Sequence, residues 1–434
     1  MKEFDKVIGY DAIKKELMQI GDVLKNNESY KKLGVTAPRG LMLHGDPGVG
    51  KTLMASALME ASGRKAIICR KDKPNGDFVK ALKAAFKEAK ETAPSIIFLD
   101  DMDKFANGDS RRRDQEEYVT VQSCIDNIKG KDVFVLATAN DIDVLPSSLL
   151  RAGRFDRVIE VCNPRGDDAV NIMAHYIKQK KCVGEIDAAV VARLLDGCSC
   201  AELETAINEA GLLAGYERAD VITMDHVIKA CLHTVHDIPN DVLNRGHLDV
   251  DIYDANEQVT RVIWHEAGHA AVAEVLDPGS VTLVSAYSGN KSSGGFTSQY
   301  NNGNNGIIEY RMADVCISLA GKAALEQKFG ITDIGVSRDL EQAFRTVTML
   351  IGGCCSGGFN LHLDRFENPD ETEARVDPAA AVEIERLYRK TKEILAKNND
   401  LLCGIAKALF EKSYLTAADI EKIKSNCRVV LVSL

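Results

Sequence analysis

The first part of the chain alternates between two spacings of hydrophobic residues. Short unbroken apolar runs, typical of buried strands, are separated by stretches in which apolar residues recur every three or four positions, as on one face of a helix. The runs are Gly40–His44, Lys65–Cys69, Ser95–Leu99, Asp132–Ala137 and Val158–Val161. Because strands that alternate with helices usually form a parallel sheet, we predict an α/β domain over residues 1–162.

The pattern changes after Pro164 and Gly166, which mark a turn. Beyond them the spacing becomes purely helical, for example over Val190–Leu195. We therefore predict a helical subdomain over residues 163–238. The polar stretch that follows, residues 239–256, is predicted to be a linker.

The last domain, residues 257–434, is predicted to combine helices with a small β-element. It opens on a helix, continues through two strands and an Asn- and Gly-rich loop, and ends in two helices within Ala379–Lys424. In chain order these elements are Val259–Leu276, Val281–Ala286, Gly295–Tyr300, Asn301–Gly306, Ala379–Ala396 and a shorter helix after Asn399.

Composition excludes some classes of protein. The net charge of −10 disfavours nucleic acid as the main partner, because no positive field attracts phosphates. No run of about 18 apolar residues lacks a charge, so no transmembrane segment is predicted. The N-terminus lacks an apolar signal segment, and the 12 cysteines are scattered without a CxxC pair. We therefore expect a cytoplasmic protein with reduced thiols.

Residues 45–52 match the phosphate-binding pattern GxxxxGK[ST]. The match follows an apolar run that ends at Leu43 and precedes a helical pattern from Leu53. In that setting, backbone N–H groups and the helix N-terminus bind phosphate oxygens, while the lysine reaches the β/γ-phosphates and the threonine hydroxyl binds Mg²⁺. The predicted ATP-binding residues are Gly45, Asp46, Pro47, Gly48, Val49, Gly50, Lys51 and Thr52.

Polar residues after two later strands extend this site. Asp100 and Asp101 follow the third apolar run, where a carboxylate beside the phosphate loop can hold Mg²⁺. Asn140 follows the fourth run and brings an amide to the same edge of the sheet. Arg151 and Arg154 come next, and arginines that stabilise phosphoryl transfer often come from a neighbouring subunit.

A second motif, HExxH, spans His265–His269 within the predicted helix Val259–Leu276. Positions i and i+4 lie on one face of a helix, so His265 and His269 can bind one Zn²⁺, with Glu266 as the general base. A catalytic zinc needs a third protein ligand, and spacing alone leaves several acids possible. These candidates are Asp314, Glu326, Asp333 and Asp339.

Together the motifs resemble those of a known family. Residues 1–235 resemble AAA+ ATPases, and nearly the whole chain resembles the FtsH family of ATP-dependent zinc proteases, including Leu319–Ala324 and Ile334–Leu340. The resemblance implies an α/β AAA+ P-loop module with a helical lid, then a mainly α-helical zinc metallopeptidase domain with a small β-element. It implies an ATP-dependent zinc metalloendopeptidase that uses Zn²⁺, ATP and Mg²⁺, acts on protein or peptide substrates and forms a homo-hexameric ring.

The resemblance also implies roles for single residues of the nucleotide site. Near the N-terminus, Val7, Ile8 and Gly9 correspond to the segment that contacts adenine in the family. His175 corresponds to a lid histidine near the nucleoside, and Asn140 to the sensor asparagine.

Further roles implied by the resemblance concern the ring and the zinc. Arg151 and Arg154 correspond to two arginine fingers that act in trans. The segment Ile334–Leu340 resembles the family segment whose aspartate is the third zinc ligand, which here is Asp339.

Three features depart from the family pattern. The family's two N-terminal membrane helices are not found in this sequence, so we expect no membrane residence. Asp101 stands where the family has glutamate, and a carboxylate set back by about 1.5 Å costs on the order of 100-fold in rate. The charged stretch Arg70–Asp77 replaces a pore loop that carries an aromatic residue, and Phe78 is expected to begin the next helix.

Three functional hypotheses are compatible with these motifs. The leading one is a ring-forming, ATP-dependent zinc endopeptidase. The second keeps the peptidase but makes the ATPase module a nucleotide-gated, weakly hydrolysing scaffold, because of Asp101 and the charged stretch. The third is an ATP-dependent remodelling or chaperone-like protein. In each case Ser293–Gln299 is either an edge strand that pairs with a substrate peptide or a plain hairpin strand.

Overall fold

The computed structural model describes residues 2–34, 36–72, 75–106, 116–239, 251–289, 294–300, 306–358, 361–362 and 369–432. The chain forms two compact units, Met1–Met224 and Asp225–Leu434, and each is considered by itself. The finer boundaries at 162, 238 and 256 remain predictions. Most of the predicted linker 239–256, most of the loop Asn301–Gly306, and Ser293 lie outside the described residues.

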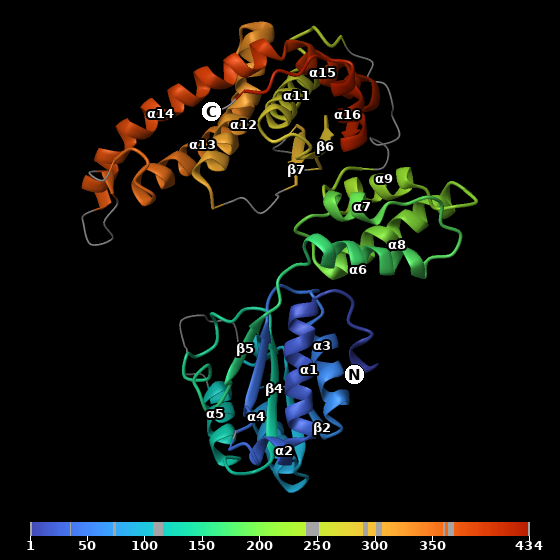
Figure 1. Cartoon of the computed structure of the whole chain (residues 1–434), viewed down its shortest axis with the longest axis vertical. Helices are drawn as coiled ribbons and strands as arrows, with labels where there is room; N and C mark the ends of the chain where they lie inside the picture. The colour runs from blue at the N-terminus through green and yellow to red at the C-terminus, as the bar shows by residue number, and fades with distance from the viewer. Residues whose placement is uncertain are drawn as a thin grey trace. The chain divides into compact units, whose positions relative to one another are not determined.

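A parallel sheet of five strands, in the order β2-β3-β4-β1-β5, forms the centre of the first unit (Figure 1). All five strands fall on the apolar runs of the sequence, with ends that differ by at most two residues. Their bounds are β1 Gly40–His44, β2 Lys65–Arg70, β3 Ser95–Asp100, β4 Val133–Ala139 and β5 Arg157–Glu160.

Helices cover both faces of this sheet, with α1 (Asp11–Lys25) and α3 (Lys51–Ser62) on one side and α4 (Asn75–Glu91) and α5 (Glu116–Asn127) on the other (Figure 1). Alternate strand residues such as Ile97 and Leu99 pack into the core under α4 and α5. The central strands β1, β3 and β4 are buried on both faces, which explains their unbroken apolar runs.

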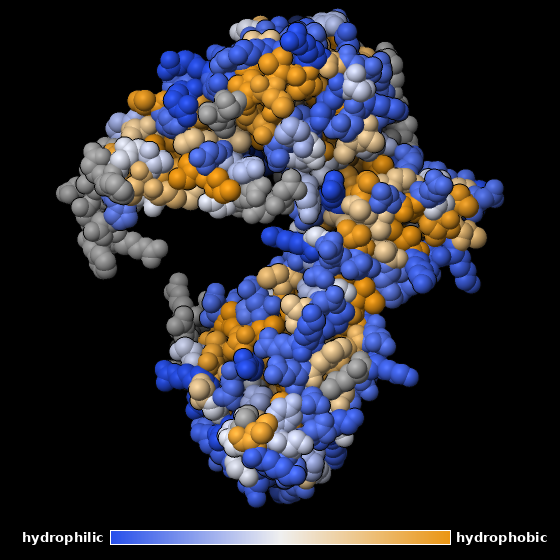
Figure 2. Space-filling view, viewed as in Figure 1, coloured by the Kyte–Doolittle hydropathy of each residue, from blue (hydrophilic) through white to orange (hydrophobic). Residues whose placement is uncertain are grey.

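A short helix, α2 (Asn27–Lys31), directly follows α1. After the sheet, the first unit continues into a run of helices. The later helices are α6 (Gly166–Gln179), α7 (Ala188–Leu194), α8 (Cys200–Tyr216) and α9 (Met224–Thr234), the last of which crosses the boundary between the units. Ser199 begins α8 with a capping box shared with Glu202. Figure 2 shows hydrophobic side chains at the surface over this helical region, where the exposed apolar residues include Val190 and Leu212.

Phe78 lies inside α4, three residues after the start of that helix. Its side chain is 1% exposed and meets Phe105 edge to face, with ring centroids 4.8 Å apart. The sequence placed Phe78 at the beginning of this helix. The helix begins at Asn75 instead, so Phe78 lies in its first turn, from where its side chain packs into the core. Lys73 and Pro74 of the charged stretch lie outside the described residues.

Two long helices, α11 (Gln258–Leu276) and α12 (Ile308–Phe329), form the centre of the second unit. Further α-helices among the described residues of this unit are α13 (Ser337–Thr348), α14 (Pro369–Lys397), α15 (Asn399–Lys412) and α16 (Ala417–Ser425). An antiparallel sheet of order β7-β6-β8 packs beside them, with β6 at Val281–Ser285, β7 at Phe296–Gln299 and β8 at Tyr414–Thr416.

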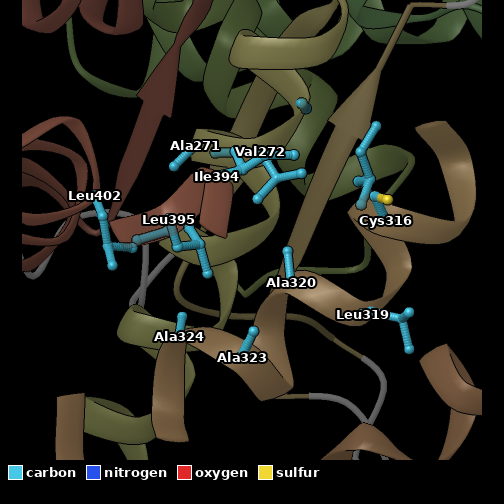
Figure 3. Close-up of a cluster of buried hydrophobic side chains, with 14 of the residues drawn as sticks. Ala271, Val272, Cys316, Leu319, Ala320, Ala323, Ala324, Ile394, Leu395 and Leu402 are labelled. Carbon is cyan, nitrogen blue, oxygen red and sulfur yellow. The ribbon is translucent and has the colours of Figure 1, made fainter. Parts of the chain in front are cut away.

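Small side chains let α11 and α12 approach closely. The buried cluster between them includes Ala271 of α11 and Ala320 and Ala324 of α12 (Figure 3). A Cβ atom on Gly268 would lie 2.7 Å from both the Ala320 carbonyl oxygen and the Ala324 methyl group. Glycine at this position therefore keeps the backbones close, which matters because α11 carries the HExxH motif.

The C-terminal prediction was wrong in two details. Helix α14 begins at Pro369 rather than Ala379, because Pro378 is accommodated within the helix instead of starting it. The region after Asn399 contains strand β8 and helix α16 as well as α15. Tyr414–Thr416 pairs with β6, and Thr416 then begins α16 through a capping box with Asp419.

Among the residues that the structure describes, no helix is both long enough and apolar enough to cross a membrane. The cytoplasmic location expected from the sequence remains a prediction.

Candidate functional site

The loop between β1 and α3 has the backbone shape of an anion site. Gly48 and Gly50 have φ angles of +83° and +95°, which side chains other than glycine rarely adopt. Helix α3 begins directly after them at Lys51. Backbone N–H groups and the helix N-terminus therefore point toward the same space, which favours a phosphate.

Lys51 and Asn140 meet at this loop. The Lys51 ammonium is buried and donates hydrogen bonds to the carbonyl oxygens of Gly45 and Asp46, each at 2.7 Å, and to Asn140 Oδ1 at 2.9 Å. Burial lowers the pKa of Lys51 below its usual value. Asn140 is itself held in place, because its backbone N–H donates a hydrogen bond to Asp103 Oδ1 at 2.9 Å. This bond fixes Asn140 at the edge of the sheet.

Asp100 lies beside the loop and is almost fully buried. Its Oδ1 accepts hydrogen bonds from Thr138 Oγ1 at 2.8 Å and from Thr52 Oγ1 at 3.3 Å, and its Oδ2 accepts from Arg70 Nε at 2.9 Å. A hydroxyl and a carboxylate side by side are oxygen ligands of the kind Mg²⁺ prefers, so Thr52 and Asp100 fit that ion.

Asp101 has a different environment from Asp100. Its backbone lies in the left-handed region, with φ at 53°, and its N–H donates to Thr138 Oγ1 at 2.9 Å. Its carboxylate is partly exposed and lies 2.7 Å from the ammonium of Lys104. Both acids at the end of β3 therefore have a cationic partner within the chain.

A cavity of about 270 Å³ opens next to the phosphate loop. Of the residues expected around the base and nucleoside, Val7, Ile8 and His175 line it, and Gly9 lies just beyond with φ at +69°. Further lining residues that the sequence did not single out are Tyr10, Leu53, Tyr176, Cys200 and Glu204. They come from four separate segments, and no motif marks them.

The two candidate arginine fingers differ. Arg151 is exposed. Arg154 is engaged within its own chain, donating to the Ser148 carbonyl oxygen at 2.5 Å and to Asp126 Oδ2 at 2.9 Å. Hydrogen bonds from Arg154 and Lys129 lower the pKa of Asp126 to about 2. Arg154 would have to leave these partners to reach another subunit.

In the second unit, one face of α11 brings His265 and His269 together. Their Nε2 atoms lie 2.9 Å apart, and Asp339 Oδ2, from the first turn of α13, lies 3.0 Å from His265 Nε2 and 3.5 Å from His269 Nε2. Three ligands at Zn²⁺ bond lengths in a tetrahedral arrangement are separated by about 3.3 Å, so the three atoms fit this ion. Among the described residues, no other group of three such side chains could hold a metal.

Neighbouring groups orient the two imidazoles. His269 Nδ1 lies 2.7 Å from the carbonyl oxygen of Ile317, an arrangement in which Nδ1–H donates and Nε2 is left for a metal. The imidazole of His265 packs against Gly321 of α12, where a Cβ atom would collide with the ring. Helix α12 therefore positions both histidines, one by a hydrogen bond and one by close contact.

The charges of the cluster attract one another strongly. Burial by itself would raise the pKa of Asp339, but hydrogen bonds from His265 and His269 hold it well below its usual range. Burial would lower the pKa of His269, yet Asp339 and Glu266 raise it to about 9. A proton and a metal ion compete for the same imidazole nitrogen, so this negative surrounding also favours a divalent cation.

Glu266 is buried beside the cluster, and this burial raises its pKa. Its Oε2 accepts a hydrogen bond from Thr297 Oγ1 at 2.9 Å. Thr297 lies on β7, and the sequence did not assign it a role. The only sequence feature that could have pointed to Thr297 was its position in the strand predicted after the HExxH helix.

These side chains line a cavity of about 680 Å³. Its walls include the cluster, Glu266, residues of α12 and β7, and the loop before α13. The other three acids that the sequence left open each have a cationic neighbour instead. Asp314 pairs with Arg311 at 3.3 Å, Glu326 with Lys392 at 2.8 Å, and Asp333 with Arg261 at 2.5 Å.

Comparison with known proteins identifies the family. Residues 41–163 match the family model of ATPases associated with various cellular activities (AAA). The ATP-dependent zinc metalloprotease FtsH 3 of Synechocystis sp. is 27% identical over 99% of this chain and 74% of its own length. FtsH 1 of Alkaliphilus metalliredigens is 28% identical over 97% of this chain and 73% of its own length.

A further relative decides the assignment. The ATP-dependent zinc metalloprotease FtsH of Mesoplasma florum is 30% identical over 98% of this chain and 68% of its own length. Such a match covers the phosphate loop and the HExxH helix within one alignment. The chain therefore belongs to the FtsH family of ATP-dependent zinc metalloproteases and is an ATP-dependent zinc protease.

Proposed function

We propose that His265, His269 and Asp339 hold the catalytic zinc of this protease and that Glu266 is its general base. The observation that carries the proposal is the close approach of the three ligand atoms, all within 3.5 Å of one another, beside a buried carboxylate. Zn²⁺ bound there would supply a Lewis acid that polarises the peptide carbonyl and acidifies water. Glu266 accepts the proton of the attacking water and passes it to the leaving amine.

The substrate peptide is proposed to bind along β7. In the sheet order β7-β6-β8, β7 is an edge strand, and its residues Phe296, Thr297 and Gln299 line the cavity that contains Glu266. An extended peptide added to this edge would form main-chain hydrogen bonds and run past the zinc ligands. This supports a substrate-pairing strand rather than a plain hairpin strand.

The nucleotide site is proposed to bind ATP with Mg²⁺. Lys51 and the loop N–H groups would contact the phosphates, Thr52 and Asp100 would hold Mg²⁺, and Asn140 would sense the γ-phosphate. The hydrogen bonds that join Lys51 to Asn140 and Thr52 to Asp100 support this grouping.

We further propose a homo-hexameric ring, in which an arginine finger reaches the nucleotide of a neighbour. The exposed Arg151 suits this role directly. For Arg154 the proposal requires that its contacts with Ser148 and Asp126 break on assembly. The exposed apolar residues of the helical region, such as Leu212, are compatible with subunit packing.

The weakly hydrolysing form of the ATPase is the second candidate, and two observations favour it. The carboxylate of Asp101 is one methylene shorter than glutamate and is paired with Lys104, so water positioning is weak. Phe78, the aromatic residue nearest to the charged stretch, is buried and cannot grip a substrate. We propose a protease that binds ATP well, turns it over slowly and prefers unfolded chains.

The zinc assignment is tested with two variants, Glu266→Gln and Asp339→Asn. Glu266→Gln should retain one zinc per chain, measured by elemental analysis, and lose peptide cleavage, because the base is removed and the ligands remain. Asp339→Asn should lose zinc and cleavage together. Cleavage by Glu266→Gln at the rate of the parent, or full zinc in Asp339→Asn, would refute the respective assignment.

A further inference from the structure

The last residues of two neighbouring strands form an ion pair inside the nucleotide site. Strand β2 is the edge strand of the sheet and runs parallel to β3 in a register that places Arg70 beside Asp100. The Arg70 guanidinium donates from Nε at 2.9 Å and also from Nη2, both to Oδ2 of Asp100. A cation thus binds the carboxylate that is proposed to serve Mg²⁺.

The two partners have unequal surroundings. The Asp100 side chain is 1% exposed, whereas the Arg70 side chain is 62% exposed. Burying a carboxylate without a cationic partner is costly, so the contact with Arg70 offsets part of the cost of burying Asp100. The exposed arginine, on the other hand, has water on one side and space to move away.

Both carboxylate oxygens of Asp100 already have partners, so a second cation cannot bind Asp100 without changing these contacts. Its Oδ1 faces two hydroxyl groups, Thr138 Oγ1 and Thr52 Oγ1, while Oδ2 faces the guanidinium. Mg²⁺ demands near-octahedral oxygen coordination, with carboxylates bound directly or through water. The guanidinium and hydrated Mg²⁺ are both positive and both require the same carboxylate.

We propose that Arg70 is a positioning residue of the nucleotide site that competes with Mg²⁺ for Asp100. Before the metal binds, Arg70 neutralises Asp100 and keeps its carboxylate turned toward Thr52. Mg²⁺ gains less from Asp100 than it would in a site without the arginine, because it must first displace the guanidinium. Mg²⁺ should therefore strengthen nucleotide binding only modestly in this protein. This inference rests on the proposed assignment of Thr52 and Asp100 to a Mg²⁺–nucleotide site.

The test measures how strongly Mg²⁺ is coupled to nucleotide binding. The probe is methylanthraniloyl-ADP, whose fluorescence reports binding without hydrolysis, and its Kd is determined with EDTA and with excess Mg²⁺. The Kd with EDTA is divided by the Kd with Mg²⁺, and this ratio is compared between the parent protein and Arg70→Met. We expect the ratio to rise about tenfold in the variant, within the usual range of coupling between two ligands.

Controls separate this role from general effects of charge and fold. Lys65→Met removes a cation from the other end of β2, where Lys65 forms an exposed pair with Glu88 at 2.8 Å, and should leave the ratio unchanged. Arg70→Lys keeps the charge and should stay near the parent ratio. If Arg70→Met does not fold, Arg70→Gln is measured instead, with folding followed by circular dichroism.

The outcomes are distinguishable. A ratio in Arg70→Met within twofold of the parent, or a loss of binding under both conditions, would overturn the competition. If the parent itself bound no probe under either condition, the proposed nucleotide site would be rejected rather than the role of Arg70.

Discussion

The hydroxyl of Thr297 holds the carboxylate of Glu266, the proposed general base, at 2.9 Å. A hydrogen bond to a charged group contributes about 1.5–3 kcal/mol, so its loss should allow the carboxylate to turn away from the zinc ligands. We predict that Thr297→Val lowers kcat for peptide cleavage by about tenfold or more, with KM and zinc content unchanged. Steady-state kinetics on a short fluorogenic peptide measure this.

The matched control is Thr297→Ser, which keeps the hydroxyl and removes one methyl group. It should retain most of kcat. Equal losses in the valine and serine variants would show that Thr297 acts through packing rather than through its hydroxyl group.

Asp101 is proposed to limit the rate of ATP hydrolysis. Its carboxylate is one methylene short and is paired with Lys104 at 2.7 Å. We predict that Asp101→Glu raises ATP turnover on the order of 10- to 100-fold with little change in nucleotide affinity, because a misplacement near 1 Å costs that much. Phosphate release measures turnover. If Asp101→Glu hydrolysed ATP no faster than the parent, the proposal that Asp101 makes the ATPase slow would be wrong.

At the scale of single residues, the motifs predicted two zinc ligands and the base, whereas spacing left the third ligand open and only the resemblance to the FtsH family pointed to Asp339. Asp314, Asp333 and Asp339 all line the same cavity, so proximity to the site is not what separates them. The difference lies in their neighbours: Asp333 pairs with Arg261, which is 72 positions away in the chain. Such pairs depend on the folded arrangement, and spacing along the sequence does not reveal them.

Among the elements, α12 supports the zinc site by its closeness to α11. Gly321 of α12 touches the His265 ring, and any added methyl group would collide with it. We predict that Gly321→Ala weakens zinc binding at least about tenfold, as other changes around metal ligands do. Competition with a chromogenic chelator measures the affinity.

A control for the intrinsic effect of alanine is Gly215→Ala in α8, where a Cβ atom meets nothing within 4 Å. Alanine is the better helix former, so this variant should be at least as stable as the parent and should keep its zinc affinity. Unchanged zinc affinity in Gly321→Ala would contradict the account of how α12 positions His265.

Helices α12 and α14 are joined by an ionic network around Glu326. Although burial favours the neutral carboxyl, hydrogen bonds from Lys322, Lys392 and Tyr388 lower the pKa of Glu326 to about 2. A depressed carboxyl pKa stabilises the fold above the pKa of the unfolded chain, and this contribution is lost as the pH falls toward the folded-state pKa. We predict that Glu326→Gln lowers the free energy of unfolding by about 1 kcal/mol at neutral pH.

The difference between parent and Glu326→Gln should shrink as the pH falls below about 4.5 toward about 2. Urea unfolding is followed by the fluorescence of Trp264, the single tryptophan, which lies buried in α11 and reports the second unit. Glu393→Gln, which removes two surface pairs within α14, with Lys390 and Lys397, is the control and should change little. A difference that is constant with pH would exclude an ionic origin.

The elements of the sheet were predictable because each buried strand is a short apolar run between turns. Strand β8 was missed, since Tyr414–Thr416 has only three residues and owes its strand form to pairing with β6. The start of α14 was placed too late: the helix begins at Pro369 and continues through Pro378, a residue type that usually interrupts helices. A strand that depends on pairing with a distant strand, and a proline tolerated inside a helix, cannot be predicted from local sequence patterns.

For the whole molecule, the two proposed sites lie in separate compact units, the nucleotide site in Met1–Met224 and the zinc site in Asp225–Leu434. Each site is assembled from residues of its own unit. Dependence of proteolysis on ATP must therefore come from communication between units or between subunits of a ring. The membership of the chain in the FtsH family makes that dependence the central claim.

The most direct measurement follows degradation of casein, an unfolded substrate, by the purified protein. Zinc is present or removed by chelation, and each condition is run with ATP, with ADP and without nucleotide. The account predicts that cleavage requires zinc and is several-fold faster with ATP than with ADP or no nucleotide. Zinc-dependent cleavage that is the same under all three nucleotide conditions, or cleavage that persists without zinc, would contradict it.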